Sequence, residues 1–384
     1  WGTNYDYILL QQLTNFPTLG QAIKEKGWPP LKVGFNHRGP GKLLPAPWLD
    51  NKYLCTPKDF RRYGIDVNTL QRLPKDDVYY RRGKAEQFQA PFVLFKRTQV
   101  QREIGAAYFD QDCAYSETFT CIAGAEEDRK LLKATTALLN SELAQYYLFL
   151  TSASWGVERE EIKAGELRAL PFPFLDATDD QIDTISYLVD ELAQHGSTLL
   201  NKQKDEIEAE LNRQIYACFH LSEREKQHIH ETIEYTIKFF HRPETSLALK
   251  EPSSLEMEKT YAQSYMQSLN FYLEMVDRKL TSTVYAHAQE KSPLLVVKFS
   301  LNMLDAGIAD IREEAPDDEM RQALSKLSKL STERVSGRMY HRRNFKIYEN
   351  DDEDTLYIVK PAERRYWTIG AALSDAEETL ADLM

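Results

Sequence analysis

The sequence predicts an α+β fold, with a mixed sheet in the first part, long helices in the middle and a smaller α/β region at the end. Short runs of aromatic and β-branched residues after residue 75, such as PFVLF at 91–95, are typical of strands. Apolar residues recur at three-to-four spacing between Glu126 and Leu150, which predicts a buried amphipathic helix. The apolar run SPLLVVKFSL at 292–301 then returns to strand character.

The length of the chain predicts more than one domain. At 384 residues it exceeds what a single hydrophobic core usually supports. The pattern changes near residue 175, after the prolines at 171 and 173, and again near residue 242. We therefore expect an α/β domain at 1–175, a helical segment at 176–242 and an α/β extension at 243–384.

The first of these segments opens with a short amphipathic helix at 6–13 and continues in Gly/Pro-rich loops. The stretch FNHRGPGKLLPAP at 35–47 superficially resembles a phosphate-binding loop. However, Pro40 follows the first glycine where that motif has lysine, and Leu43 follows Lys42 where it has Ser or Thr. We interpret it as an ordinary loop.

The middle segment predicts helices at 178–204 and 206–219, with aspartates in the first turns. A further helix begins at Ser222, where Ser222 and Glu225 form a capping box. The last segment predicts a helix at 253–279, the strand at 292–301, a hairpin at 345–361 with an acidic turn, and a helix at 371–384.

Composition narrows the class of protein. The chain is 42% hydrophobic and 28% charged, as soluble globular proteins are, and it has no apolar run long enough to span a membrane. Its four cysteines show no CxxC pair, which favours reduced thiols in a cytoplasmic protein over disulfides. Because the chain opens WGTNYDYILL, without Met or a basic leader, we expect it to be cut from a longer protein.

Charge is unevenly distributed along the chain, although the net charge is -11. Residues 58–103 hold eleven Lys or Arg against six Asp or Glu, whereas residues 176–234 hold five against fourteen. A basic strip on an otherwise acidic body suits a polyanion on one face. Ordinary surface variation explains the same asymmetry, and charge alone does not decide between them.

Catalytic signatures are missing from the sequence. It contains no GxSxG, no HExxH and no glycine fingerprint after a strand. His220, His228 and His230 are eight and two residues apart, whereas helical metal ligands need three or four, so packing or surface roles are favoured over a metal site. The cluster at 351–354 with Lys360 comes nearest to a metal-dependent nuclease, but a solvated turn is the better interpretation. We predict no metal site.

A flipped-base motif is also missing. The [DN]PP[YF] motif, with which amino-methylating DNA methyltransferases hold a base, does not occur, and the Pro29–Pro30 pair is flanked by Trp28 and Leu31.

Cations alternate with planar side chains in the first segment. Lysine and arginine neutralise phosphates, and glutamines at 87, 89, 99 and 101 could pair with adenine. The exposed face of a sheet produces the same alternation, and from these residues alone it is the preferred reading. The cations that we single out as candidate DNA-binding residues are Arg81, Arg82, Lys84, Lys96, Arg97 and Arg102.

Six segments resemble one family, in this order along the chain: WGTNYDYILLQQLTNFPTLG, RRYGID, YYRRGK, APFVLFKRTQVQREIGAAYFD, LLNSELAQYYLFLTSASWGVEREEI and LRALPFPF. The family is the C-terminal target-recognition region of bacterial adenine-specific DNA methyltransferases, of the TaqI-like and type IIG or type I-like restriction-modification or phage-defence kind. LNRQIYACFHLSEREKQHI resembles the helical element that follows that region. The resemblance covers about 1–234, and it is much weaker beyond.

The resemblance implies a function for the first domain. It would recognise a short sequence in double-stranded DNA and present it to a methyltransferase catalytic domain elsewhere in the parent protein, which would use S-adenosylmethionine to methylate a flipped adenine. We expect no cofactor in this chain and no catalysis by it, because the flipping motif is missing. In this family the turn at Trp155, Gly156 and Glu158 ends the recognition fold. Trp155 is expected to pack that turn on the sheet, and Arg159 either pairs with Glu158 or faces DNA.

Two other functions remain open at this stage. The acidic helices and the C-terminal segment could dock other defence-system subunits, which would make the chain a non-catalytic assembly or regulatory protein. A stand-alone nuclease is the weakest alternative, because the sequence shows no metal cluster.

Overall fold

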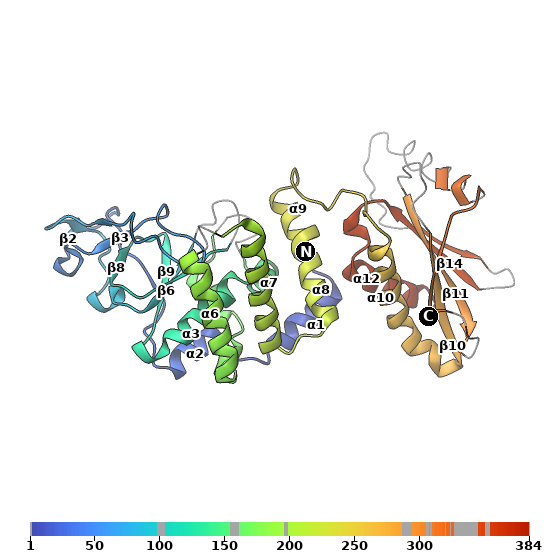
Figure 1. Ribbon diagram of the computed structural model, residues 1–384, viewed down its shortest axis with the longest axis horizontal. Coiled ribbons are helices and arrows are strands. Elements are labelled where there is room, and N and C mark those ends of the chain that lie inside the picture. The colour runs from blue at the N-terminus through green and yellow to red at the C-terminus, as the bar shows by residue number, and fades with distance from the viewer. Residues whose placement is uncertain are drawn as a thin grey trace. The chain divides into compact units, whose positions relative to one another are not determined.

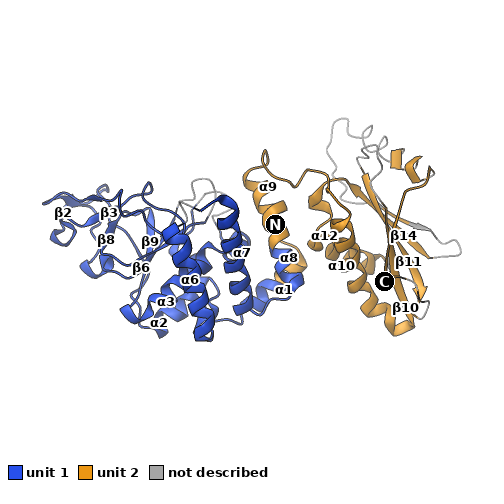
Figure 2. Cartoon of the chain, viewed as in Figure 1, with its two compact units in different colours: residues 1, 8–229 blue, residues 2–7, 230–384 orange. Residues whose placement is uncertain are grey.

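The computed structural model describes residues 2–97, 104–153, 161–195, 199–285, 294–304, 307, 309–318, 320–322, 324–325, 345–349 and 354–383. They form two compact units (Figure 2), one of residues 1 and 8–229 and the other of residues 2–7 and 230–384. Both combine helices with sheets, which confirms the α+β class. The boundary expected near 175 lies inside the first unit and the one near 242 inside the second, and a three-domain division stays a prediction.

The described residues of the first unit form three sheets, and strands of each are labelled in Figure 1. The largest has four antiparallel strands in the order β1-β9-β6-β7, and a three-stranded sheet, β4-β3-β8, pairs β3 with β8 in parallel. A two-stranded sheet joins β2 to β5. The strands are β1 (Lys32–Val33), β2 (Leu44–Pro45), β3 (Tyr53–Cys55), β4 (Gln71–Arg72), β5 (Val78–Tyr79), β6 (Phe92–Lys96), β7 (Ala106–Phe109), β8 (Cys113–Tyr115) and β9 (Phe119–Ala123).

The predicted strand at 91–95 is the centre of this unit. It corresponds to β6, whose first four residues are all buried because the strand is covered on both faces. Phe92 packs against Phe109 and Tyr115, with ring centroids 6.1 and 5.8 Å away. A core of aromatic rings therefore holds the small sheets together.

The helix predicted from Glu126 to Leu150 is wrong as a single element. The structure has two helices, α3 (Arg129–Asn140) and α4 (Glu142–Thr151), separated by Ser141. The Ser141 hydroxyl accepts a hydrogen bond from the Ala144 amide at 3.1 Å and so caps a new helix. The neighbouring Asn140 side chain bonds both backbone groups of Ala106 in β7, which anchors the break to the sheet.

The acidic helix that begins the predicted middle segment belongs to the first unit, where it pairs with α3. Asp183 and Asp190 of α6 (Asp179–His195) pair with Lys130 and Lys133 of α3, both at 2.6 Å. These two pairs neutralise part of the acidic charge of residues 176–234 within one unit. The other helices of the unit are α1 (Asn4–Leu13), whose first residues group with the second unit, α2 (Leu19–Glu25), α5 (Ala164–Ala169), α7 (Asn201–Cys218) and α8 (Glu223–Thr232), which ends in the second unit.

The boundary expected between residues 204 and 206 is also wrong. The first long helix ends at His195, directly before Gly196 in the sequence, and α7 begins at Asn201. The Leu200 amide donates to the Gln203 side chain at 3.2 Å, which satisfies one of the donors at the start of α7. The capping box at Ser222 is confirmed by reciprocal bonds with Glu225 of 2.7 and 3.3 Å.

The second unit is a mixed five-stranded sheet in the order β12-β10-β11-β14-β13, packed on two helices (Figure 1). The predicted hairpin is confirmed, since β13 and β14 pair antiparallel. Strand β10 was not predicted, because its residues RKLTSTVY follow a helical pattern without a clear break. The elements are α9 (Lys238–His241), α10 (Glu256–Leu273), β10 (Arg278–Tyr285), β11 (Leu294–Met303), β12 (Ile311–Glu314), β13 (Phe345–Glu349), β14 (Thr355–Pro361) and α12 (Ile369–Leu383).

Candidate functional site

Arg81 lies where three separate segments of the first unit meet. Its backbone pairs with that of Asn36 through hydrogen bonds of 2.7 and 3.0 Å. The Arg81 guanidinium is 3.9 Å from the Glu117 carboxylate, which also accepts a 2.6 Å hydrogen bond from the Asn36 amide. Half of the Arg81 side chain is exposed to solvent. This cation is therefore oriented by Glu117 and still accessible.

A cavity of about 620 Å³, the Arg81 pocket, opens beside this cation. Lys32, Arg81 and Lys84 bring three cations to its wall, against the single carboxylate of Glu86. The rest of the lining is mostly apolar. The lining residues are Pro29, Pro30, Leu31, Lys32, Val33, Arg81, Gly83, Lys84, Glu86, Gln87, Cys121 and Ala123.

Local backbone geometry places Lys84 on this wall. Gly83 has φ +64°, in the left-handed region, and a Cβ there would come within 2.8 Å of the Gln87 side chain. The turn therefore needs glycine at position 83, directly before Lys84. The Gln87 side-chain amide donates to the Val33 carbonyl at 2.9 Å, so it ties the segment after Lys84 to β1.

Arg97 is a structural cation in this unit. Its guanidinium donates to the Glu117 carbonyl at 2.9 Å and forms an ion pair with Glu161. The Arg97 carbonyl accepts from the Ile162 amide at 3.1 Å. Only 23% of the side chain is exposed, so Arg97 ties a later segment to the sheet and supports the Glu117 turn.

Two further predicted cations lie outside the pocket lining. Arg82 donates to the Pro45 carbonyl at 2.9 Å and its guanidinium is 5.3 Å from the Trp48 ring centroid. Lys96 ends β6 and is partly buried. Arg102, Arg159 and the turn of Trp155, Gly156 and Glu158 fall outside the described residues, so their roles stay predictions.

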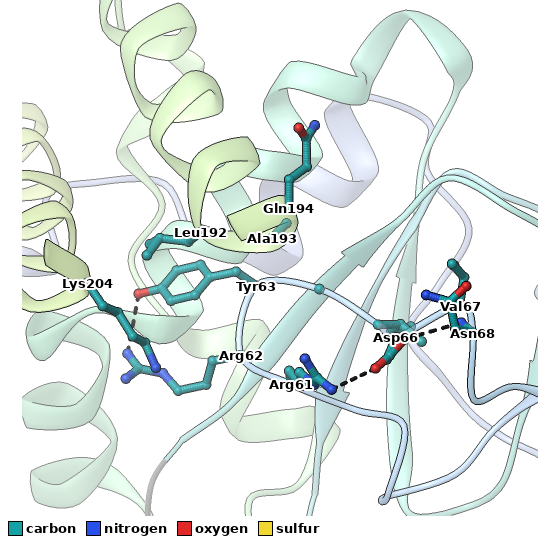
Figure 3. A pocket seen from close by; sticks show the side chains of 12 residues that line it. Arg61, Arg62, Tyr63, Asp66, Val67, Asn68, Leu192, Ala193, Gln194 and Lys204 are labelled. Atoms are coloured by element: carbon teal, nitrogen blue, oxygen red, sulfur yellow. Dashed lines mark hydrogen bonds and ion pairs between the residues drawn. The ribbon is translucent and has the colours of Figure 1, made fainter. Parts of the chain in front are cut away.

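A second cavity of about 550 Å³, the Tyr63 pocket, was not predicted from the sequence (Figure 3). It forms where the RRYGID segment meets the end of α6 and the start of α7. The clustered cations and the glycine of that segment were the available signal. The lining residues are Arg61, Arg62, Tyr63, Gly64, Ile65, Asp66, Val67, Asn68, Leu192, Ala193, Gln194 and Lys204.

Tyr63 shapes this pocket through an unusual backbone conformation. Its φ of 74° is left-handed, which is rare for a bulky side chain. The strand β7 holds it there, since the Tyr63 amide donates to the Ala106 carbonyl at 2.8 Å and its carbonyl accepts from Tyr108 at 3.2 Å. Burial raises the pKa of the Tyr63 phenol well above its usual value.

The two arginines beside Tyr63 have fixed partners. Figure 3 shows Arg61 turned toward Asp66, with 2.6 Å between guanidinium and carboxylate. Arg62 pairs with Glu208 of α7 at 3.2 Å and donates to the Asn140 carbonyl at 2.8 Å. The pocket wall is therefore braced by links to two helices.

No family model matches the chain, and no curated protein matches it. One solved structure with some likeness is a type IIL restriction-modification enzyme, MmeI, in complex with DNA. Identity is 11% and the TM-score is 0.36, over 50% of this chain and 33% of that one. This likeness is too weak to carry an argument.

Residues 351–353 of the acidic cluster lie outside the described residues, so the interpretation of that turn stays a prediction. The described residues contain no group of three or more His, Cys, Asp or Glu that could hold a metal ion. His228 is buried with its ring edge-on to Tyr146, and His220 lies just after α7 with φ 54°. Lys360, considered with the acidic turn, instead forms a buried ion pair with Asp375 of α12.

The four cysteines are protected from solvent by burial. All four cysteines are buried and unbonded to one another, and burial raises the pKa of Cys113 and Cys121 to about 12. Thiolate chemistry at these two positions is therefore disfavoured.

Among the helices in the described part of the chain, none has the length and apolar character needed to cross a membrane.

Proposed function

We propose that the first unit binds double-stranded DNA and serves as the target-recognition part of an adenine-specific DNA methyltransferase. The observation that carries the proposal is the Arg81 pocket, where Lys32, Arg81 and Lys84 face one cavity of the domain. The order of the family-like segments along the chain supports the same function.

The cations would act on the DNA backbone. Lys32, Arg81 and Lys84 would neutralise phosphates and release counterions, which gives affinity that falls as salt rises. Arg97, tied to Glu161 and to the Glu117 carbonyl, would position the Arg81 side chain rather than touch DNA. We assign these three cations to phosphate contacts only, and we assign no residue to base recognition.

Methylation would take place on another part of the parent protein. S-adenosylmethionine would supply the methyl group there. The residues of this chain do not fit that chemistry, because it lacks the [DN]PP[YF] motif. We therefore assign no catalytic step to it.

Duplex binding at several salt concentrations tests the proposal. In fluorescence anisotropy, Lys84→Gln should weaken binding and reduce the slope of log affinity against log salt by about 1, because one phosphate contact is lost. Lys202→Gln is the matched control, since Lys202 is 88% exposed on α7 and outside the pocket. Absence of duplex binding by the folded chain at low salt would refute the function.

A second candidate is a non-catalytic assembly subunit that docks a methyltransferase catalytic subunit. Large apolar side chains gather at the end of α10 and the adjoining strand ends, and such patches often mark protein interfaces. The exposed residues are Phe271, Tyr272, Met275, Val276, Met303 and Leu304. In this case Phe271→Ser would abolish complex formation with that subunit in size-exclusion chromatography, whereas Lys84→Gln would leave it intact.

A further inference from the structure

The Tyr63 pocket has more positive than negative charge in its wall. Arg61, Arg62 and Lys204 line it together with one carboxylate, that of Asp66. Asp66 pairs with Arg61, and Glu208 outside the lining pairs with Arg62. The Lys204 ammonium, by contrast, makes no ion pair with any residue that the structure describes, although its side chain is half-buried.

A pocket of this kind favours an anion with several oxygens. Like charges around one concave wall raise the local positive potential, and an oxyanion lowers their mutual repulsion while accepting charge-assisted hydrogen bonds. The amides of Asn68 and Gln194 line the same wall and add uncharged donors. Val67, which is exposed, and the partly buried Ile65 supply apolar surface, which a bare ion would not need.

The wall is also preorganised. Arg62 is held by Glu208 and by the Asn140 carbonyl, and the left-handed Tyr63 is held by β7. Gly64 lets the turn approach α6 closely, because a Cβ there would lie 3.2 Å from the Ala193 Cβ. A strained residue that its surroundings hold in place is typical of ligand sites.

We propose that the Tyr63 pocket binds a phosphate group of a nucleotide-sized ligand, with Lys204 and Arg61 as the contacting cations. The volume of about 550 Å³ lies within the roughly 300–1,000 Å³ of small-molecule sites. The phosphate comes either from a soluble nucleotide or from the backbone of bound DNA. The site shares no lining residue with the Arg81 pocket, so a soluble nucleotide as the source stands without the function proposed above, whereas DNA as the source rests on it.

Isothermal titration calorimetry of the full chain with inorganic phosphate and with AMP tests the first source. We expect AMP to bind, and Lys204→Gln to weaken it at least tenfold. Lys202→Gln, two residues away on the same exposed helix, should leave the affinity unchanged, and so should Lys84→Gln. Circular dichroism of each variant confirms that the fold is retained.

Duplex binding by the same variants tests the second source. If the phosphate belongs to DNA, AMP gives no heat, and Lys204→Gln lowers duplex affinity several-fold at low salt while Lys202→Gln does not. The phosphate site is overturned if neither probe binds and duplex affinity is the same in Lys204→Gln as in the unsubstituted chain. Weaker duplex binding in Lys84→Gln with AMP binding retained would separate the two pockets.

Discussion

At the residue scale, the most demanding feature is an ammonium in the core of the second unit. Lys360 is 2% exposed and pairs with Asp375, which also accepts a 2.5 Å hydrogen bond from the Tyr261 hydroxyl. Its ammonium lies 4.5 Å from the Tyr261 ring centroid and donates to the Tyr366 carbonyl at 3.0 Å. Burial lowers the pKa of Lys360, against the opposite effect of Asp375. The charge is tolerated only because these partners surround it.

We expect Asp375→Ala to destabilise the protein by about 3–5 kcal/mol, because it leaves a buried ammonium without its counterion. Urea unfolding followed by circular dichroism measures the loss. Glu378→Gln is the matched control on the same helix, since the Glu378 carboxylate is mostly exposed and 3.6 Å from Lys346, and it should cost about 0–1 kcal/mol. Equal losses in the two variants would contradict the buried-pair account.

Buried tyrosines predict a loss of stability at alkaline pH. Burial raises the pKa of Tyr79 and of Tyr108 from 10.0 to about 12. Below pH 10 both phenols are protonated in the folded and unfolded chain, so their effect is constant. Between pH 10 and about 12 only the unfolded chain releases these protons, so the free energy of unfolding falls as pH rises.

Urea unfolding at several alkaline pH values, with tyrosinate absorbance as the second signal, measures this fall. Tyr108→Phe should show a shallower dependence on pH than the unsubstituted chain, because one of the two phenols no longer titrates. An identical pH dependence in the two proteins would show that Tyr108 does not contribute.

At the element scale, ion pairs attach α6 to α3. The Lys133–Asp190 pair is largely shielded from solvent on the lysine side, and Lys133 also lies 5.3 Å from the Tyr108 ring centroid. The Lys130–Asp183 pair has the same 2.6 Å separation but is exposed on both sides. Because water screens exposed pairs, the two should differ in strength although their geometry matches.

Double-mutant cycles with alanine at each pair measure this difference. We expect a coupling energy of about 0.5–1 kcal/mol for Lys133 with Asp190 and near zero for Lys130 with Asp183. A larger coupling in the exposed pair would mean that burial does not control how the acidic helix is attached.

Sequence pattern predicted elements well where one local signal dominated. The apolar strand β6, the β13–β14 hairpin and the capping box at Ser222 were all predicted. The break at Ser141 was missed, because it depends on Asn140 bonding to β7, which lies 34 residues earlier. Helical periodicity continues through such a break.

In the candidate site, too, local features were predictable from the sequence and long-range partners were not. Arg81 and Lys84 were predictable as neighbours, because one glycine turn separates them. The structural role of Arg97 was not, since its partner Glu161 is 64 residues away. The Tyr63 pocket joins 61–68 to 192–204, so the cations and glycine of the first segment could hint at a site but could not reveal its second wall.

At the scale of the whole molecule, each unit has its own core. Among the described residues, the core of the second unit is formed by residues from 255 to 380, and Phe299, Tyr265 and Trp367 are fully buried in it. The Ile369 amide also donates to Glu231 at 2.7 Å, so the helix end at 230–232 belongs to the same unit. Independent cores predict independent folding.

We therefore expect a fragment of residues 230–384 to fold by itself. Trp367 is the only tryptophan in that range, so its fluorescence should shift cooperatively in urea as the buried indole is exposed. If the fluorescence reports this core, Phe299→Ala should lower the urea midpoint. The expected loss in the free energy of unfolding is about 3–5 kcal/mol. If Trp367 of the fragment is already exposed to solvent without urea, the core depends on the first unit. If the fragment is folded but binds no duplex, DNA binding belongs to residues 8–229.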